Sequence, residues 1–314
     1  MAGVPTVLAV DIGGTKMAVG LAGVDGRLRH ARRVATPAGP DGEAVFAALA
    51  GLVDEVVAAA RDEGDAPVAC GVGCGGPMAR GGETVSPLNI AGWRAFPLRA
   101  RLSERTGVPT FVDNDAKALA LGEGWRGAAA GERDFLAMVV STGVGGGIVL
   151  DGRLLDGAGG NAGHIGHVIA APGGRACVCG ARGCLEAEAS GTAISAITGR
   201  PAAEAPPEVR ERTGRLVGRS VASVANLLDL RLAVVAGSVA LGFGDDFFGP
   251  AQDELDRHAR LDYSTGARIR PGGLGSDGPL VGAAAVALTG LGLPVLGTAA
   301  DVPPTAGGAG TGDR

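Results

Sequence analysis

The stretch "TVLAVDIGGTKMAVGLAGVDGRL", residues 6–28, consists of two apolar runs, each followed by a turn that contains glycine. Apolar runs joined by a short glycine turn are typical of a β-hairpin. The stretch "DFLAMVVSTGVGGGIVLDGRLLDG", residues 134–157, repeats the same order of strand, glycine turn, strand and DG turn. A pattern that occurs twice predicts a duplicated unit. We therefore expect an α/β fold built of two similar domains with a cleft between them.

The segments around these hairpins alternate between strand and helix patterns. Before the second hairpin we expect strands over 29–37, 68–78 and 108–115, and helices over 42–64, 98–107 and from 116 onward. After it we expect helices over 190–198, 212–230 and 280–292, and a buried strand over 231–240.

This order of elements predicts two domains and a tail. The smaller N-terminal α/β domain is expected over 1–116 and is completed by the helix near 280–292, and the larger C-terminal α/β domain is expected over 117–279. Residues 294–314 are rich in Gly, Ala, Thr and Pro without periodicity, and we predict that they are disordered.

The composition favours small-molecule partners. The chain has 314 residues, 46% of them hydrophobic, and a formal net charge of −5. It lacks a basic stripe for nucleic acid and a polybasic anchor for a membrane, so we expect neither partner. Its N-terminus lacks a signal-peptide pattern, and no apolar run reaches the roughly 18 residues of a membrane span. We therefore expect a cytoplasmic protein.

"DIGGTK", residues 11–16, is the first of three candidate phosphate-binding turns. Its two glycines allow backbone N–H groups to approach phosphate oxygens, and the hydroxyl and amine that follow add donors and charge. Asp11 ends the strand, where its carboxylate is able to hold Mg²⁺ through water. The other turns are "STGVGGG", residues 141–147, and "AGS", residues 236–238. The residues of the first turn are Gly13, Gly14, Thr15 and Lys16.

Each turn taken alone also fits an ordinary hairpin, because the chain contains 57 glycines. Two turns at equivalent places in a repeated unit favour nucleotide binding. The chain contains no G-x-x-x-x-G-K-[ST] loop, and its glycine turns do not lead from a strand into a helix as in a G-x-G-x-x-G motif. The hairpin context is typical instead of the duplicated, actin-like (ribonuclease H-like) ATPase fold of sugar kinases.

"FVDNDAKA" places Asn114 and Asp115 where a strand ends and a helix begins. A carboxylate there is able to accept the proton of a sugar hydroxyl as it attacks the γ-phosphate of ATP, while the neighbouring amide orients the sugar. Asp113 is the competing carboxylate. The alternative is that "DND" is only an Asx turn with a helix N-cap. In "SPLNIAGW", Asn89 is a second candidate for binding sugar hydroxyls, or a simple turn residue.

Three further residues are expected to be structural. Lys117, one of only two lysines in the chain, is interpreted as a solvated helix residue rather than a phosphate ligand. Cys70 and Cys74 flank a buried strand and are expected to be small core residues.

The remaining three cysteines lie close to a histidine in the pattern H-x9-C-x-C-x4-C. One imidazole and three thiolates match a closed tetrahedral zinc site, which leaves no position for water. We therefore expect a structural metal. The alternative is that the cysteines are merely buried or form an adventitious disulfide. The four expected ligands are His167, Cys177, Cys179 and Cys184.

These motifs, in this order, resemble the ROK family of bacterial repressors and sugar kinases. The resemblance rests on "DIGGTK", "NDA", "STGVGGG", "GHIGH" and "CVCGARGCLEAEASG" across residues 7–192, and "VVAGSV" with the last helix extends it to about 290. It implies an ATP-dependent hexose kinase, with Mg²⁺ and a structural Zn²⁺, whose active site lies between two α/β domains. It also implies a homodimer.

The resemblance assigns roles to individual residues. Asp115 is then the general base, and His167 both ligates zinc and lies beside the sugar. The other residues expected to bind sugar are Asn89, Asn114, His164 and Glu186. The residues that match nucleotide-side positions are Thr15, Lys16, Thr142, Gly143 and Gly237.

The chain departs from the family pattern at His164. Many members have Glu-x-Gly-His where this chain has His164-Ile165-Gly166-His167, so an imidazole replaces a carboxylate. A neutral imidazole offers one donor and one acceptor, whereas a carboxylate only accepts. We expect this exchange to change which hydroxyls are favoured. "AGHIGH" is similar to kinases of N-acetylmannosamine and "SPLNIAGWRAFPL" to glucokinases, so both sugars remain as expected substrates.

Two alternatives belong to other functional classes. The family's transcription regulators carry a helix-turn-helix domain ahead of the first phosphate turn, whereas the first strand here begins near Val4, so DNA binding is not expected. A non-catalytic sugar-binding protein is the other alternative, because His164 replaces a family carboxylate.

Overall fold

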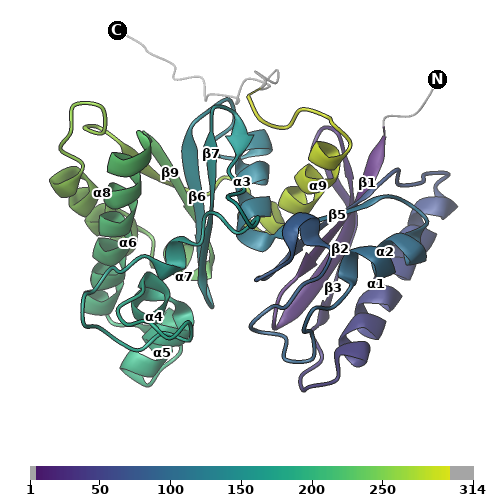
Figure 1. Cartoon of the computed structure of the whole chain (residues 1–314), viewed down its shortest axis with the longest axis horizontal. Helices are drawn as coiled ribbons and strands as arrows, with labels where there is room; N and C mark the ends of the chain where they lie inside the picture. Colours follow the sequence, from purple (N-terminus) through teal and green to yellow (C-terminus); the bar gives the residue numbers. More distant parts are fainter. Residues whose placement is uncertain (1–4, 298–314) are drawn as a thin grey trace, which may run out of the picture.

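The computed structural model describes residues 5–297, and its strands form two five-stranded sheets (Figure 1). The first sheet has the order β3-β2-β1-β4-β5 and the second the order β10-β9-β6-β7-β8. The strands of the first sheet are β1 (Thr6–Ile12), β2 (Lys16–Gly23), β3 (Leu28–Ala35), β4 (Cys70–Cys74) and β5 (Thr110–Asn114). Those of the second are β6 (Phe135–Val140), β7 (Val144–Leu150), β8 (Arg153–Leu154), β9 (Leu232–Ala236) and β10 (Arg268–Pro271).

The two sheets have the same topology when one order is reversed. In the first, β1 is antiparallel to β2, with Val10 opposite Val19, and parallel to β4. In the second, β6 is antiparallel to β7, with Met138 opposite Gly146, and parallel to β9. The two quoted hairpins therefore occupy equivalent places, and the predicted duplicated α/β fold is confirmed.

Helices cover the sheets. Those from the first half of the chain are α1 (Gly42–Asp62), α2 (Leu98–Thr106) and α3 (Asp115–Arg126). Those from the second half are α4 (Leu185–Ala189), α5 (Gly191–Thr198), α6 (Pro207–Leu228), α7 (Ser238–Phe243), α8 (Asp245–His258) and α9 (Gly278–Gly290). None of the helices that the structure describes is long and apolar enough to cross a membrane.

Two helix predictions need correction. The helix expected over 212–230 begins earlier, at Pro207, because proline has the φ angle of a first helical turn and needs no N–H partner there. The amphipathic helix α8 lies outside the predicted helices, although Phe247, Ala251 and Leu255 repeat at a spacing of four and are buried against the second sheet's core.

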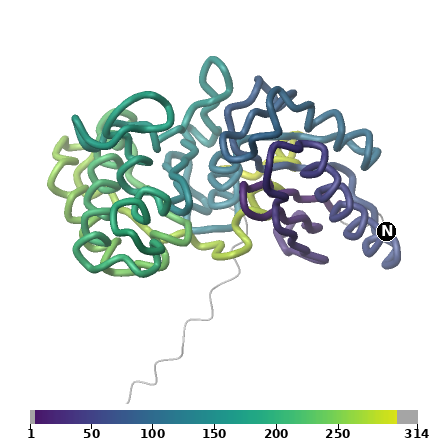
Figure 2. The backbone as a smooth tube through the Cα atoms, turned by 90° about the horizontal axis from the view of Figure 1, so that it is seen from below, coloured from purple at the N-terminus to yellow at the C-terminus, as the bar shows by residue number. Residues whose placement is uncertain are grey.

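Each sheet has an apolar core on its outer face. Buried side chains of α1, among them Leu49 and Val53, pack on Val10, Val19 and Val72 of the first sheet. In the second half, α6 and α8 pack against each other and contribute to a core with β6 and β9. Figure 2 shows the purple and blue first third of the chain on one side and the green segments on the other.

The helices α3 and α9 cross between the two sheets, where Figure 1 shows them side by side. α3 follows β5 of the first sheet and packs on β6 and β7 of the second, whereas α9 follows β10 and packs on β1 and β4 of the first. A β-carbon at Gly122 would lie 3.0 Å from the Cα of Gly282, and one at Gly282 would lie 2.5 Å from the carbonyl oxygen of Ala118. The two backbones are therefore in direct contact.

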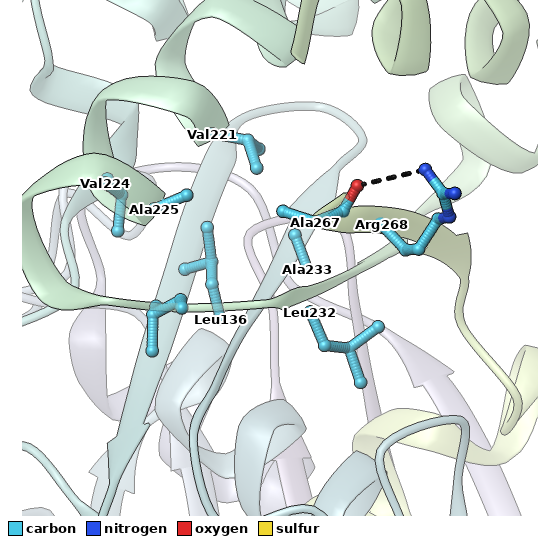
Figure 3. Close-up of a pocket in the computed structure, with 9 residues that line it drawn as sticks. Leu136, Val221, Val224, Ala225, Leu232, Ala233, Ala267 and Arg268 are labelled. Atoms are coloured by element: carbon cyan, nitrogen blue, oxygen red, sulfur yellow. Dashed lines mark hydrogen bonds between the residues drawn. The ribbon is translucent and has the colours of Figure 1, made fainter. Parts of the chain in front are cut away.

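A small apolar cavity lies beneath the C-terminal end of α6 (Figure 3). Its volume is about 10 Å³, roughly the space of one water molecule, and its lining is almost entirely apolar. A sugar or nucleotide does not fit, so this cavity is a packing gap in the second core. The lining residues that Figure 3 labels are Leu136, Val221, Val224, Ala225, Leu232, Ala233, Ala267 and Arg268.

The predicted disordered tail begins too early. Val295 is buried in the core around α9, and Leu296 packs against it, because these two side chains are apolar and lie beside α3 and α9. The rest of that segment, 298–314, lies outside the described residues.

The glycine crossing can be tested by adding a methyl group. We expect Gly282→Ala to destabilise the fold by about 1–3 kcal/mol, because the new methyl group meets backbone rather than a mobile side chain. Gly51→Ala in α1 is the matched control, since a β-carbon there meets nothing within 4 Å, and it should stabilise by about 0.5–1 kcal/mol. Urea unfolding midpoints measure both. A Gly282→Ala midpoint at or above the wild-type value would contradict the crossing.

Candidate active site

The turn between β1 and β2 presents its tip to solvent. The N–H of Gly13 donates to the carbonyl oxygen of Lys16 at 3.0 Å and closes the turn, so it is already used within the hairpin. For the N–H groups of Gly14 and Thr15, the described part of the chain offers no acceptor. Thr15 and Lys16 are exposed. Of the four residues expected to bind phosphate, Gly14 and Thr15 therefore offer backbone N–H groups and Lys16 offers an exposed side chain.

The turn between β6 and β7 is also closed by a backbone hydrogen bond, here over two residues: the N–H of Ser141 donates to the carbonyl oxygen of Gly143 at 2.9 Å. Thr142 at its tip is exposed. The predicted turn over 141–147 is too long, because β7 begins at residue 144. The glycines of β7 have a packing role instead, since a β-carbon at Gly147 would lie 2.7 Å from the Cβ of Ala120 in α3.

The third predicted turn lies against the second. Gly237 has a φ of 101°, and a β-carbon there would lie 2.4 Å from the carbonyl oxygen of Val140. The hydroxyl oxygens of Ser141 and Ser238 are 2.9 Å apart. Glycine is therefore required for this approach, and the two turns form one surface at the end of β6 and β9.

Asn114 and Asp115 lie at the junction of β5 and α3. Asn114 is the N-cap of α3: its Oδ1 accepts from the N–H of Ala116 at 3.0 Å. The capping alternative is thus correct for this oxygen, and the amide nitrogen is left for other partners. Asp115 also accepts from Ala116, at 2.8 Å. Burial raises the pKa of Asp115. The hydrogen bond from Ala116 opposes this effect but does not cancel it.

Asp11 lies close to Asp115. Both are near Gly73 of β4, where a β-carbon would lie 3.8 Å from Asp11 Oδ1 and 3.6 Å from the Cα of Asp115. Burial, and then the charge of Asp115, raise the pKa of Asp11 from its ordinary 3.8 to about 7, against the opposing charges of Lys16 and Arg33. Two partly buried carboxylates whose charges repel each other form a site that favours a bound cation.

The loops after β4 bring more predicted residues to this place. Asn89 contacts the first turn, since a β-carbon at Gly14 would lie 2.8 Å from the Cβ of Asn89. A β-carbon at Gly76 would lie 3.5 Å from Asn114 Nδ2 and 3.8 Å from His164 Cε1. Asn114 of the first half and His164 of the second half therefore face the same short segment.

Glu186 and His164 complete the group from the second half. Glu186 Oε2 accepts from the N–H of Val144 at 3.0 Å, which ties this carboxylate to the second turn. Its charge acts on both Asp115 and His164. Burial, and then the neighbouring His167, lower the pKa of His164, which favours the neutral imidazole.

The cysteine and histidine side chains converge as the sequence predicts. The ligand atoms of His167, Cys177, Cys179 and Cys184 all lie within 4.8 Å of one another. His167 Nδ1 is 3.7 Å from Cys177 Sγ, and the sulfurs of Cys179 and Cys184 are also 3.7 Å apart. A tetrahedral ion with Zn–S bonds of about 2.3 Å requires an edge of about 3.8 Å between sulfurs. These residues therefore fit zinc.

Cys70 and Cys74 are fully buried, as predicted, whereas the prediction for Lys117 is wrong. Lys117 is 2% exposed, and its ammonium pairs with Asp113 at 3.0 Å and Asp156 at 2.7 Å. The spacing of four between Asp113 and Lys117 on the predicted helix start was a usable signal for an ion pair. Asp156, almost forty residues further on, had no such signal.

Comparison with known proteins identifies the family of this chain. The sequence model described as the ROK family matches residues 7–289, which is most of the chain. The chain belongs to the ROK family. The predicted resemblance is confirmed, and so is the actin-like ATPase fold of ROK sugar kinases.

Several ROK relatives have names that state an activity. The N-acetylmannosamine kinase of Escherichia fergusonii is 39% identical over 254 residues, which cover 76% of this chain and 85% of that protein. The ROK family glucokinase from Streptomyces griseus, solved with glucose and AMPPNP, has a TM-score of 0.78 and 30% identity, covering 90% of this chain and 99% of that one. The ROK hexokinase from Thermus thermophilus has a TM-score of 0.78 and 36% identity, covering 91% and 99%.

Metal analysis tests the cysteine cluster. We expect about one zinc per chain in the purified protein, because one histidine and three cysteines form a closed site. Cys179→Ser and Cys184→Ser should each lose the metal and lower the melting temperature. Cys70→Ala, a change at a buried thiol outside the cluster, should retain it. Elemental analysis by mass spectrometry gives the ratio, and a full zinc content in both serine variants would contradict the assignment.

The pKa of Asp11 predicts a pH-dependent stability. Because folding raises this pKa from 3.8 to about 7, the ionised carboxylate destabilises the ligand-free fold; the penalty is absent below pH 3.8 and complete above about pH 7. Asp11→Asn removes it. We expect the melting temperature of the variant to exceed that of the wild type by a margin that grows between about pH 4 and pH 7 and is constant above that range. The exposed Asp62→Asn is the control, and a margin that shrinks with rising pH would contradict the prediction.

Proposed function

We propose that this sugar kinase of the ROK family transfers the γ-phosphate of ATP to the 6-hydroxyl of an aldohexose. The observation that carries the proposal is the meeting of Asp115, Asn114 and His164 beside Asp11 and the first glycine turn. Phosphoryl transfer depends on positioning and charge neutralisation, and a site of this kind supplies both.

Asp115 is the proposed general base. Its carboxylate would accept the proton of the 6-hydroxyl while the hydroxyl oxygen attacks the γ-phosphorus and the bond to the ADP oxygen breaks. A raised pKa makes this carboxylate a stronger base than an exposed aspartate. Burial also raises the pKa of Asp113, the competing carboxylate. Its Oδ1 is already occupied, however, by the ammonium of Lys117 at 3.0 Å and the N–H of Asn114 at 2.8 Å.

The sugar is proposed to lie between the loop of Asn89 and the segment of His164. The amide oxygen of Asn114 accepts the hydrogen bond that caps α3, so its amide nitrogen is the group that would donate to a sugar oxygen. Glu186 has one oxygen committed to Val144, and its other oxygen would accept from a hydroxyl. The residues proposed to contact the sugar are Asn89, Asn114, His164, His167 and Glu186.

ATP is proposed to lie across the glycine turns. Asp11 would hold Mg²⁺, and the ion would neutralise charge on the transferred phosphate and relieve the repulsion between Asp11 and Asp115. The N–H groups of Gly14 and Thr15 and the exposed Lys16 would bind phosphate oxygens. The proposed nucleotide residues are Asp11, Gly13, Gly14, Thr15, Lys16, Thr142, Gly143 and Gly237, with Gly13 acting through the shape of the turn.

Zinc in this proposal has a structural role. Four protein ligands leave no open position for water or substrate. Glu188 of α4 accepts from the N–H of Arg175 at 2.6 Å, which fixes the start of the cysteine segment. The ion would hold the short helix of Glu186 and the segment of His164 and His167 in one place.

Glucose and N-acetylmannosamine are the two proposed sugars, since this chain resembles both an N-acetylmannosamine kinase and a glucokinase. A coupled assay that follows ADP release, with ATP, Mg²⁺ and a panel of hexoses, tests the proposal. Turnover with one or both of these sugars is expected. Absence of turnover with every aldohexose would overturn the proposed activity in favour of a non-catalytic sugar-binding protein, which calorimetry with the same sugars detects.

Substitution of the base gives a sharper test. We expect Asp115→Asn to lower kcat by about 10²–10⁴-fold, because the proton acceptor is lost while the shape of the site is kept. The sugar KM should stay within about threefold of the wild type. Asp62→Asn is the control: Asp62 is an exposed residue at the end of α1, and this variant should have wild-type kinetics. An unchanged kcat in Asp115→Asn would assign the proton to another group.

A further inference from the structure

Lys117 is the most deeply buried cation of the site region, and the proposed reaction does not use it. Its side chain is 3% exposed, whereas the side chains of its partners Asp113 and Asp156 are 20% and 64% exposed. Burial opposes the charge, but the two aspartates outweigh it and leave the pKa of Lys117 raised. The lysine is therefore held as a cation two residues after Asp115.

The partners of Lys117 come from two different segments. Asp113 lies in β5, next to the start of the same helix, and an i,i+4 pair of this kind stabilises a helix end. Asp156 Oδ1 at 2.7 Å and the carbonyl oxygen of Gly160 at 3.2 Å lie instead in the loop 155–163, which follows β8. One ammonium thus bonds to the strand before Asp115 and to a distant loop at two points.

Further hydrogen bonds fix the conformation of the loop 155–163. The N–H of Ala162 donates to the backbone oxygen of Asp156 at 2.9 Å, which closes the loop on itself. Asn161 Nδ2 reaches the carbonyl oxygen of Met78, at 3.5 Å, on the loop after β4. The loop therefore extends from the second half of the molecule to the first.

The loop leads directly into His164. A β-carbon at Gly163 would lie 2.6 Å from the carbonyl oxygen of Gly146, so the chain turns sharply against β7 just before the histidine. A displacement of the loop at Asp156 or Gly160 would then be passed to His164, because only the short segment 161–163 separates Gly160 from the histidine.

We propose that Lys117 is a positioning residue that holds the loop 155–163 against the start of α3 and so fixes His164 on the sugar side of Asp115. The inference rests on the proposed function of Asp115 and His164. A purely structural role of Lys117 would need only the pair with Asp113, which stabilises the start of α3. The contact with Asp156 adds a link between the helix of the base and the loop of the histidine.

Asp156→Asn is the variant that separates the two roles. It removes the charge that holds the loop, keeps the size of the side chain, and leaves the Lys117–Asp113 pair in place. Asp151→Asn is the matched control, since Asp151 is also exposed and ion-paired, through Arg133, but lies in the turn between β7 and β8. Asp156→Glu, which keeps the charge, is the conservative variant.

We expect Asp156→Asn to raise the sugar KM by about tenfold, with the KM for ATP and kcat within about twofold of the wild type. Asp156→Glu should recover most of the sugar KM, and Asp151→Asn should have wild-type kinetics. The melting temperatures of Asp156→Asn and Asp151→Asn should agree. An unchanged sugar KM in Asp156→Asn, or an equal change in the sugar KM of Asp151→Asn, would overturn the proposal.

Hydrogen exchange measured by mass spectrometry gives a readout that does not need turnover. Peptides covering 155–163 should exchange faster in Asp156→Asn than in the wild type or in Asp151→Asn, because the link to Lys117 is weakened. Unchanged exchange would overturn the proposed link even if the wild type is an active kinase. A wild type without turnover on any hexose would overturn the proposed function, and the exchange data would still decide whether Lys117 holds the loop.

Discussion

The backbone contact between α3 and α9 at Gly122 and Gly282 is the constraint on which the arrangement of the two sheets depends. Each helix follows one sheet and packs on the other, so the two crossings of the chain between the halves meet at this one place. Close-packed backbones leave little freedom of distance. Since α3 begins with Asp115, the same contact determines where the proposed base lies relative to the first sheet and to Asp11.

The site keeps charges in an environment that does not favour them. Asp11 and Asp115 lie close together and are partly buried, and the pKa values of both carboxyl groups are raised. Such an arrangement destabilises the ligand-free protein, and it is relieved by a cation or by a proton. Local choices that oppose stability are expected at functional sites, where the rest of the fold compensates for them. Here the cores on the outer faces of the two sheets supply that compensation.

The segment between β8 and α5 is held by polar and metal-binding contacts in addition to the apolar side chains, among them Ile165, Ala170 and Leu185, that it adds to the second core. Lys117 holds its beginning, and the four residues that fit zinc hold its centre. Glu188, buried in α4, accepts from Arg175 and pairs with Arg212 at its end. Long loops without regular structure lose much conformational entropy on folding. Several strong fixed points therefore allow a loop of this length to carry His164 and Glu186 to a defined place.

Much of the fold was predictable from the sequence because its signals are local. The two hairpins, the cap at Asn114 and the zinc pattern around Cys177 each lie within a short stretch, where spacing alone determines geometry. The terminal segment at Val295 was missed because its burial depends on partners elsewhere in the chain. The helix α8 was missed although its apolar spacing is a local signal, since Pro250 interrupts the helix pattern in the sequence. Lys117 shows the limit most clearly: Asp113 lies only four residues before it, but its second partner, Asp156, reaches it across 39 residues. The sequence by itself determined the duplicated fold, the family and the set of reactive side chains, since these depend on local spacing. Only the tertiary structure decided which of those side chains meet and which charges are buried, because burial and ion pairing depend on segments that folding brings together.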